Sequence, residues 1–270
     1  MTTYDAESTS RHVTAAGVRL RVHEAGTGPL LLLIHGGAPG ATGWANFGQN
    51  LPAFADHFRT VIVDLPGYGE SEMPASIEGG RYTFYGDVFA ALVAELGETS
   101  AHVVGLATGG AAALAMALDH PEVVSRLVLV SSAGGLPIFS TMPSEGQKAV
   151  RGYYRGEGPS REKMRAYLGL SVHDQSIVTD ELVEQRYQNS IQARGSEPGS
   201  PEQLWARVAG IAAPTLVIWG RDNRLQGYDN ALFFLQQIPD VEVHIFGRTG
   251  LWIPFERQSR FESLVLDYLS

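Results

Sequence analysis

The chain has 270 residues, of which 44% are hydrophobic and 18% charged, a composition typical of a compact globular domain that carries an insertion. The formal net charge of −9 argues against nucleic acid and anionic membranes as partners, because both require a basic surface. The absence of cysteine excludes disulfides, thiolate metal sites and cysteine nucleophiles. The N-terminal residues show no basic segment followed by an apolar one, so we expect a cytoplasmic protein, monomeric or homo-oligomeric.

In the first half of the chain, short apolar segments alternate with segments of helical periodicity. The predicted strands are 12–24, 30–34, 59–64, 102–105 and 126–132. The predicted helices are 83–97 and 108–119. Strands that alternate with helices indicate a mainly parallel sheet with helices on both faces.

The pattern changes after residue 136. Residues 137–205 show no strand pattern, and helix-forming stretches alternate there with Gly-, Pro- and Ser-rich breaks. Strand patterns return at 214–220 and 241–247, and an amphipathic helix follows from about 254. We therefore expect an α/β core formed by 1–136 and 206–270, with a helical cap formed by 137–205.

The segment Gly105–Gly110 (GLATGG) lies between a predicted strand and a predicted helix. This setting and the glycine spacing are typical of a nucleophile elbow, the G-x-S-x-G turn that presents a serine at a helix N-terminus. The apex here is Ala107, whose methyl group has no lone pair, so no acyl-enzyme can form on it. The alternative interpretation is an ordinary glycine-rich turn.

A second glycine-rich loop, HGGAPG (35–40), directly follows a predicted strand. Such a loop can offer backbone N–H groups to an oxyanion, because glycine allows close approach. We predict that the N–H groups of Gly37 and Thr108 form an oxyanion hole, and that His35 holds the loop in place. A purely structural turn is the alternative.

With these segments in place, the chain resembles the meta-cleavage product hydrolases, α/β-hydrolase-fold enzymes that cleave a carbon–carbon bond in vinylogous diketo acids from aromatic ring cleavage. The matching segments are HGGAPGATGWANFGQN (35–50), DLPGYGES (64–71), HDQSIVTDELVEQRYQ (173–188), WGRDNR (219–224) and FGRTGLWIPFE (246–256). They occur in family order from about residue 11 to the end. The resemblance implies an α/β-hydrolase fold and an anionic small molecule as ligand. No segment has nucleotide-binding or metal-ligand spacing, so no cofactor or metal is expected.

The catalytic positions depart from this family. The family's acid and base correspond to Asn223 and Leu251, and its nucleophile to Ala107. Asparagine carries no charge to stabilise an imidazolium, and leucine cannot transfer a proton. The neighbouring Asp222 has no evident histidine to orient. The usual serine hydrolase mechanism is therefore not expected.

The substrate-binding positions match the family more closely than the catalytic positions do. Arg186 matches the cap arginine that binds the substrate carboxylate in the family, and a guanidinium suits that role because it pairs bidentately with an anion. The resemblance also places Asn46 and Trp252 in the pocket wall, and Leu106 where the family has an asparagine. The alternatives are a solvated helix arginine, a turn asparagine and a core tryptophan. Further polar candidates are Tyr153, Tyr154, His173, Tyr228 and Arg248.

These observations favour an enzyme with retained oxyanion donors and no nucleophile. We expect non-hydrolytic chemistry, such as isomerisation, elimination, cyclisation or a cofactor-free reaction, on a small aromatic or polyketide-like acid or enol. One alternative is a pseudoenzyme that binds such a ligand without catalysis. The other is a C–C bond hydrolase with an atypical base.

Overall fold

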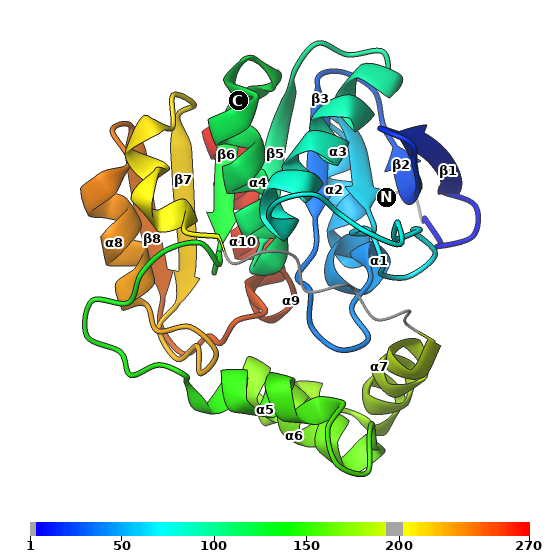
Figure 1. Cartoon of the computed structure of the whole chain (residues 1–270), viewed down its shortest axis with the longest axis vertical. Coiled ribbons are helices and arrows are strands. Elements are labelled where there is room, and N and C mark those ends of the chain that lie inside the picture. Colours follow the sequence, from blue (N-terminus) through cyan, green and yellow to red (C-terminus); the bar gives the residue numbers. More distant parts are fainter. Residues whose placement is uncertain (1–3, 193–201) are drawn as a thin grey trace.

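A computed structural model describes residues 4–192 and 202–270 and contains one sheet of eight strands in the order β1-β2-β4-β3-β5-β6-β7-β8 (Figure 1). The strands are β1 (Ser10–Ala15), β2 (Val18–Ala25), β3 (Leu30–Ile34), β4 (Arg59–Val63), β5 (Ala101–Leu106), β6 (Val124–Val130), β7 (Thr215–Gly220) and β8 (Val241–Phe246). The pairings β1–β2 and β2–β4 are antiparallel, and all others are parallel. This architecture confirms the predicted α/β-hydrolase fold.

Helices cover both faces of the sheet. The α-helices of the described residues, including three that do not cover the sheet, are α1 (Gly43–Phe47), α2 (Leu51–Ala55), α3 (Arg81–Glu95), α4 (Thr108–Asp119), α5 (Glu145–Tyr153), α6 (Arg161–Ser171), α7 (Asp180–Gln192), α8 (Asp229–Gln237), α9 (Ile253–Glu256) and α10 (Gln258–Leu269). One apolar cluster joins the sheet to α3, α4 and α8, and a second joins it to α2 and α10. Strands with helices on both sides are buried on both faces, which explains why β3 reads LLLLI without alternation.

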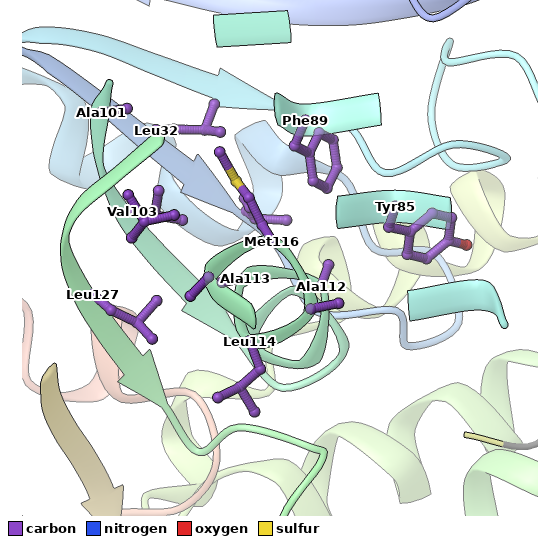
Figure 2. Packing of buried hydrophobic residues seen from close by; sticks show 14 of the residues in the cluster. Leu32, Tyr85, Phe89, Ala101, Val103, Ala112, Ala113, Leu114, Met116 and Leu127 are labelled. Atoms are coloured by element: carbon purple, nitrogen blue, oxygen red, sulfur yellow. The ribbon is translucent and has the colours of Figure 1, made fainter. Parts of the chain in front are cut away.

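Helix α4 lies close to the sheet because its buried residues are small. Figure 2 shows Ala112 and Ala113 packed among larger side chains of the sheet and of α3, such as Val103 and Phe89. A Cβ on Gly86 of α3 would lie 2.8 Å from the backbone nitrogen of Met116, so this glycine allows α3 and α4 to approach. The close packing fixes the N-terminus of α4, where the elbow lies.

The predicted strand 12–24 was wrong in one respect, because it is a hairpin. Ala16 and Gly17 form the turn between β1 and β2 with φ angles of 47° and 76°. A two-residue hairpin turn of type I′ requires positive φ at both positions, and Ala-Gly is a weaker turn signal than Asn-Gly. The alternating pattern therefore concealed the turn.

Helices α5, α6 and α7 lie outside the two helical layers, and Figure 1 shows them together below the carboxyl ends of the parallel strands. We call α5–α7 the cap helices. The cap boundaries at 137 and 205 stay a prediction, and 193–201 of that segment lie outside the described residues. Within the described part of the chain, no helix has the length and apolar character that crossing a bilayer requires.

Candidate active site

The turn between β5 and α4 has the backbone of a strained elbow. Ala107 connects Leu106 to Thr108 with φ 48° and ψ −109°, a conformation that residues other than glycine rarely adopt. Side chains on Gly105 and Gly109 would collide with the backbone of α4 and of the end of β3, so both positions require glycine. The chain thus keeps a nucleophile-type turn without a nucleophile at its apex.

The strained turn leads to a stability prediction. Strain at such a residue costs on the order of 1–3 kcal/mol, and glycine relieves it at an entropic cost of roughly 0.5–1 kcal/mol. We expect Ala107→Gly to raise the free energy of unfolding by about 1 kcal/mol, measured by urea denaturation. The control is Ala91→Gly inside α3, where glycine should destabilise by a similar amount. Destabilisation by Ala107→Gly would show that the turn is unstrained.

The loop after β3 lies directly against this turn. A Cβ on Gly36 would be 3.4 Å from the Ala107 Cβ, and one on Gly37 would be 2.8 Å from the Thr108 Oγ1. Thr108 is the first residue of α4, so its N–H has no acceptor within the helix. The two predicted oxyanion donors, Gly37 and Thr108, therefore lie on adjoining segments around the Ala107 methyl group.

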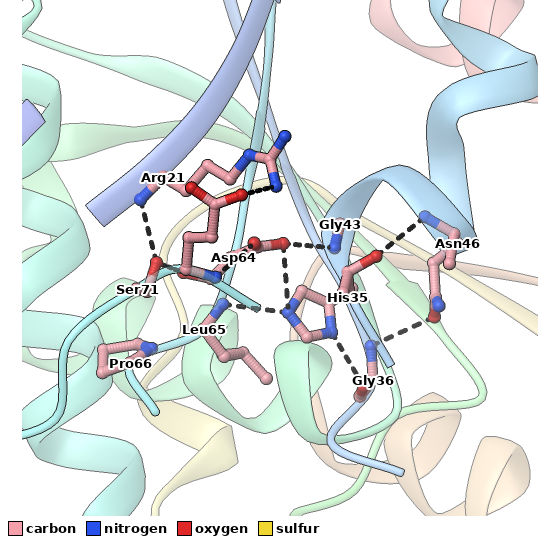
Figure 3. Close-up of polar contacts among 12 residues, drawn as sticks. Arg21, His35, Gly36, Gly43, Asn46, Asp64, Leu65, Pro66 and Ser71 are labelled. Carbon is pink, nitrogen blue, oxygen red and sulfur yellow. Dashed lines mark hydrogen bonds and ion pairs between the residues drawn. The ribbon is translucent and has the colours of Figure 1, made fainter. Parts of the chain in front are cut away.

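His35 holds this loop from behind. Its Nδ1 lies 2.8 Å from the Gly36 carbonyl oxygen, and its Nε2 accepts a hydrogen bond from the Leu65 N–H at 2.9 Å (Figure 3). Burial lowers the pKa of His35 to about 3, so the ring is neutral and Nδ1 carries the proton. Asp64 is also buried, accepts from the Gly43 N–H and has its pKa raised to about 6 by burial. Both residues stabilise the loop after β3, and neither lines the cavity.

A cavity of about 240 Å³ lies between this turn and the cap helices. It is lined by most of the residues predicted from the sequence. They are Gly37, Asn46, Leu106, Ala107, Thr108, Arg186, Leu251 and Trp252. Asn223 does not line the cavity, and neither do the further polar candidates named from the sequence.

The acid and base positions have structural roles. The Asn223 Oδ1 accepts hydrogen bonds from the N–H groups of Leu225 and Gln226, at 2.9 and 3.1 Å, and thereby stabilises the turn after β7. Asn223 lines a neighbouring surface depression rather than the cavity. The Leu251 side chain lines the cavity and presents hydrocarbon where the family has its base.

The expectation that Asp222 has no histidine to orient was wrong. A histidine does face it, because the His173 Nδ1 lies 2.8 Å from the Asp222 Oδ2. Arg221 also contacts this carboxylate and is the main reason that the pKa of Asp222 is lowered. The pair lines the same depression as Asn223, and neither member lines the cavity beside Ala107. It is a partly exposed polar contact between the cap side and the core.

Arg186 is a buried cation without a carboxylate partner. Its side chain is 3% exposed, so it is not a solvated helix arginine. Its Nη1 donates to the Gly40 carbonyl oxygen at 3.2 Å, and its guanidinium carbon lies 5.1 Å from the centre of the Trp252 ring. Burial lowers the pKa of Arg186, although a guanidinium stays charged. No acidic group among the described residues forms an ion pair with it, and an uncompensated buried charge favours binding of an anion.

Three buried N–H donors around the cavity have no partner. They are the Arg186 Nε, the Asn46 Nδ2 and the Trp252 Nε1. A buried donor without an acceptor costs roughly 1–3 kcal/mol, so a ligand with several oxygen atoms would stabilise this arrangement. At this end of the cavity the unpaired groups are donors, which favours a ligand group that carries acceptor oxygens.

Several cavity residues were missed by the sequence analysis. They are Tyr82, Gln147, Arg151, Tyr167, Ser171 and Gln226. Most lie on the cap helices or in loops, where only the docking of the helices decides which side faces inward. The polar candidates Tyr153, Tyr154, His173, Tyr228 and Arg248 do not line the cavity.

A family model for the alpha/beta hydrolase fold matches residues 29–258 of the chain. The chain belongs to the alpha/beta hydrolase family. A 2-hydroxy-6-oxononadienedioate/2-hydroxy-6-oxononatrienedioate hydrolase of Burkholderia vietnamiensis is 39% identical to this hydrolase-family chain, over 97% of it and 96% of the relative. A 2-hydroxy-6-oxo-6-phenylhexa-2,4-dienoate hydrolase of Burkholderia cepacia is 33% identical, over 100% and 99%.

A solved structure gives the same result. The meta-cleavage product hydrolase of Pseudomonas fluorescens IP01, as a serine-to-alanine mutant complexed with acetates, superposes with a TM-score of 0.84. Its identity to this member of the family is 31%, over 96% of this chain and 97% of the other. The resemblance to meta-cleavage product hydrolases is thus confirmed.

The expected non-hydrolytic chemistry was wrong. The relatives that match nearly the whole chain are hydrolases, so the comparisons favour the hydrolase alternative over isomerisation, elimination or cyclisation. The expectation of an enzyme with a small-molecule ligand agrees with these relatives. The substitutions at Ala107, Asn223 and Leu251 alter three side chains, whereas the predicted pocket residues still line one cavity.

Proposed function

We propose that this hydrolase-family chain cleaves a C–C bond in a carboxylic acid of the meta-cleavage product type and does so without a side-chain nucleophile. One observation carries the proposal. A single cavity joins the buried, unpaired Arg186 to the backbone N–H groups of Gly37 and Thr108 beside Ala107. The relatives that support it are named as hydrolases of such dienoic acids.

In this proposal Arg186 binds the carboxylate and the substrate carbonyl oxygen accepts from Gly37 and Thr108. Water attacks the polarised carbonyl carbon and forms a C–O bond. The C–C bond then breaks, its electron pair goes to the carbon conjugated with the 2-keto acid, and a proton from water ends on that carbon. The products are one carboxylic acid and one shorter keto acid. The Ala107 methyl group leaves space for the water that replaces a serine oxygen.

The groups present at this site also limit the turnover rate of the proposed hydrolysis. In a serine protease without its triad, the oxyanion hole and binding still give about 10³–10⁴-fold over water. We therefore expect turnover well below the ordinary range of about 1–10³ per second. Neither Asn223 nor Leu251 can act as acid or base in this reaction.

Ligand binding without turnover is the second candidate. It is favoured by the cavity lining, which includes no carboxylate and no imidazole among the described residues. The ionisable hydroxyls there belong to Tyr82 and Tyr167, and burial raises the pKa of both, so both stay protonated at neutral pH and neither is available as a base.

The test follows a meta-cleavage dienolate by loss of its visible absorbance and by chromatography of the acid products. Wild type should form products faster than buffer does. Thr108→Pro removes one oxyanion N–H at a first helical position that tolerates proline, and should lower the rate by about 10²-fold or more. Thr108→Ala, which keeps the N–H, is the control, and circular dichroism verifies folding. A bound dienolate without products would favour the binding protein and contradict the hydrolase.

A further inference from the structure

The predicted oxyanion donor Gly37 lies in a part of the loop after β3 that has little stiffness of its own. Gly36 and Gly37 follow one another, and glycine restricts the backbone less than any other residue. A backbone N–H stabilises an oxyanion best when its direction is fixed before the charge develops. The peptide groups on both sides of Gly37 must therefore be held by other residues.

His35 holds the first of these peptide groups. Its Nδ1 donates to the Gly36 carbonyl oxygen at 2.8 Å (Figure 3). Because this peptide group is planar and trans, the Gly37 N–H points away from that carbonyl oxygen and thus away from the His35 ring. The second peptide group joins Gly37 to Ala38, and its carbonyl oxygen faces a different residue.

That residue is Tyr68, whose hydroxyl donates to the Gly37 carbonyl oxygen at 2.9 Å. Tyr68 lies in the loop after β4 and does not line the cavity. Its ring packs edge-on against the His35 ring, with 5.5 Å between the ring centres. We propose that Tyr68 is a positioning residue of the oxyanion hole, which fixes the direction of the Gly37 N–H without touching the substrate; this rests on the proposed function.

The surroundings hold both partners of this hydrogen bond in place. A Cβ on Gly37 would lie 2.9 Å from the Tyr68 hydroxyl oxygen and 2.8 Å from the Thr108 Oγ1, so Gly37 is enclosed between Tyr68 and the other predicted donor. The Tyr68 N–H donates to the Leu65 carbonyl oxygen, and the Ser71 N–H donates to the Tyr68 carbonyl oxygen, each at 2.9 Å. Rotation of the Gly37 peptide group would therefore break its hydrogen bond, because Tyr68 could not follow it.

The first experiment measures steady-state kinetics with a meta-cleavage dienolate. Tyr68→Phe removes the hydroxyl and keeps the ring contact with His35. We expect kcat to fall about tenfold, as the loss of one net hydrogen bond gives, and KM to stay within about twofold, because the oxyanion donors act mainly on the transition state. The matched control is Tyr85→Phe, since the buried Tyr85 hydroxyl also donates to a carbonyl oxygen of the loop after β4, that of Pro66, at 3.3 Å. A merely structural role would lower the stability of both variants and leave their kcat values alike.

The second experiment needs no turnover. The ligand 2,6-dioxoheptanoate has a carbonyl group that the oxyanion donors can bind, and it stays intact because no conjugated keto group accepts the electrons of the C–C bond. The ligand 2-oxoheptanoate lacks this carbonyl group. By isothermal titration calorimetry, wild type and Tyr85→Phe should prefer the diketo acid about fivefold, whereas Tyr68→Phe should prefer it about twofold or less.

The outcomes separate this proposal from the proposed function. If wild type forms no products but Tyr68→Phe loses the preference for the diketo acid, the hydrolase is refuted and the positioning role is supported. If Tyr68→Phe keeps both kcat and the preference, or if Tyr85→Phe loses them to the same extent, the positioning role is refuted while turnover by wild type still supports the hydrolase. If wild type shows neither turnover nor the preference, both proposals fail together.

Discussion

Arg186→Gln weakens the binding of a 2-keto acid by about 30-fold or more, because the loss of one partner in a buried charge pair costs about 2 kcal/mol or more. The residue is 3% exposed and has no acidic partner among the described residues, so the bound anion supplies the missing charge. Calorimetry with 2-oxononanoate measures the effect. Arg186→Lys keeps the charge without the planar fork and should give an intermediate loss.

Stability distinguishes this role from a structural one. Without ligand, Arg186→Gln should cost no more than about 1 kcal/mol of unfolding free energy, since it removes one hydrogen bond to the Gly40 carbonyl oxygen and also a desolvated charge. The control Arg165→Gln removes an exposed ion pair with Asp180 on the cap helices and should leave affinity unchanged. A large loss of stability with unchanged affinity would contradict the anion site.

The triple change Ala107→Ser, Asn223→Asp and Leu251→His restores hydrolysis of an activated ester well above the level of Ala107→Ser alone. The elbow still has its strained backbone, with φ 48° at the apex. A serine at this position would therefore present its hydroxyl as the serine of a nucleophile elbow does. The single change should remain near background, because a serine without a base stays protonated. Only the triple variant should react rapidly with a fluorophosphonate, detected by mass spectrometry.

Two steps of the repair carry different risks. An aspartate at 223 keeps the acceptor for the N–H groups of Leu225 and Gln226, so the turn after β7 should persist. A histidine at 251 replaces a buried leucine, and the imidazole needs the new aspartate as a partner. Equal, background-level rates in the folded triple and single variants would show that the pocket has changed beyond these positions.

The parts of the site that follow from local backbone geometry were predictable. Gly105 is required because a side chain there would collide with Gly109 and Gly110, only a few residues away. Gly109 is required by a contact between distant segments, since its Cβ would collide with the carbonyl oxygens of Ile34 and His35 at the end of β3. The spacing of these glycines therefore identified the elbow and the predicted oxyanion donors. Asn46, Arg186 and Trp252 lie far apart in the chain, and only the resemblance to a family placed them together.

The remaining features depend on tertiary packing. Which side of α5 faces inward follows from its docking on the turn after β7, so Gln147 and Arg151 could not be assigned from a helical pattern alone. The pairing of His173 with Asp222 joins a segment of the cap insertion to the turn after β7. The chemistry was mispredicted for another reason: side chains at three positions can change while the pocket that selects the ligand persists.

The backbone contact between α7 and the loop after β3 ties the proposed anion site to the position of helix α7. Gly40 has φ 67°, and any side chain there would collide with the backbone of Arg186, so helix and loop meet at backbone distance. The Asn189 amide also donates to the Gly40 carbonyl oxygen. Lifting α7 would therefore carry the anion-binding guanidinium away from Trp252 and from the elbow. By thermodynamic linkage, an acid that binds Arg186 would stabilise the contact between α7 and the loop. The formed contact would raise the affinity for the acid by the same factor.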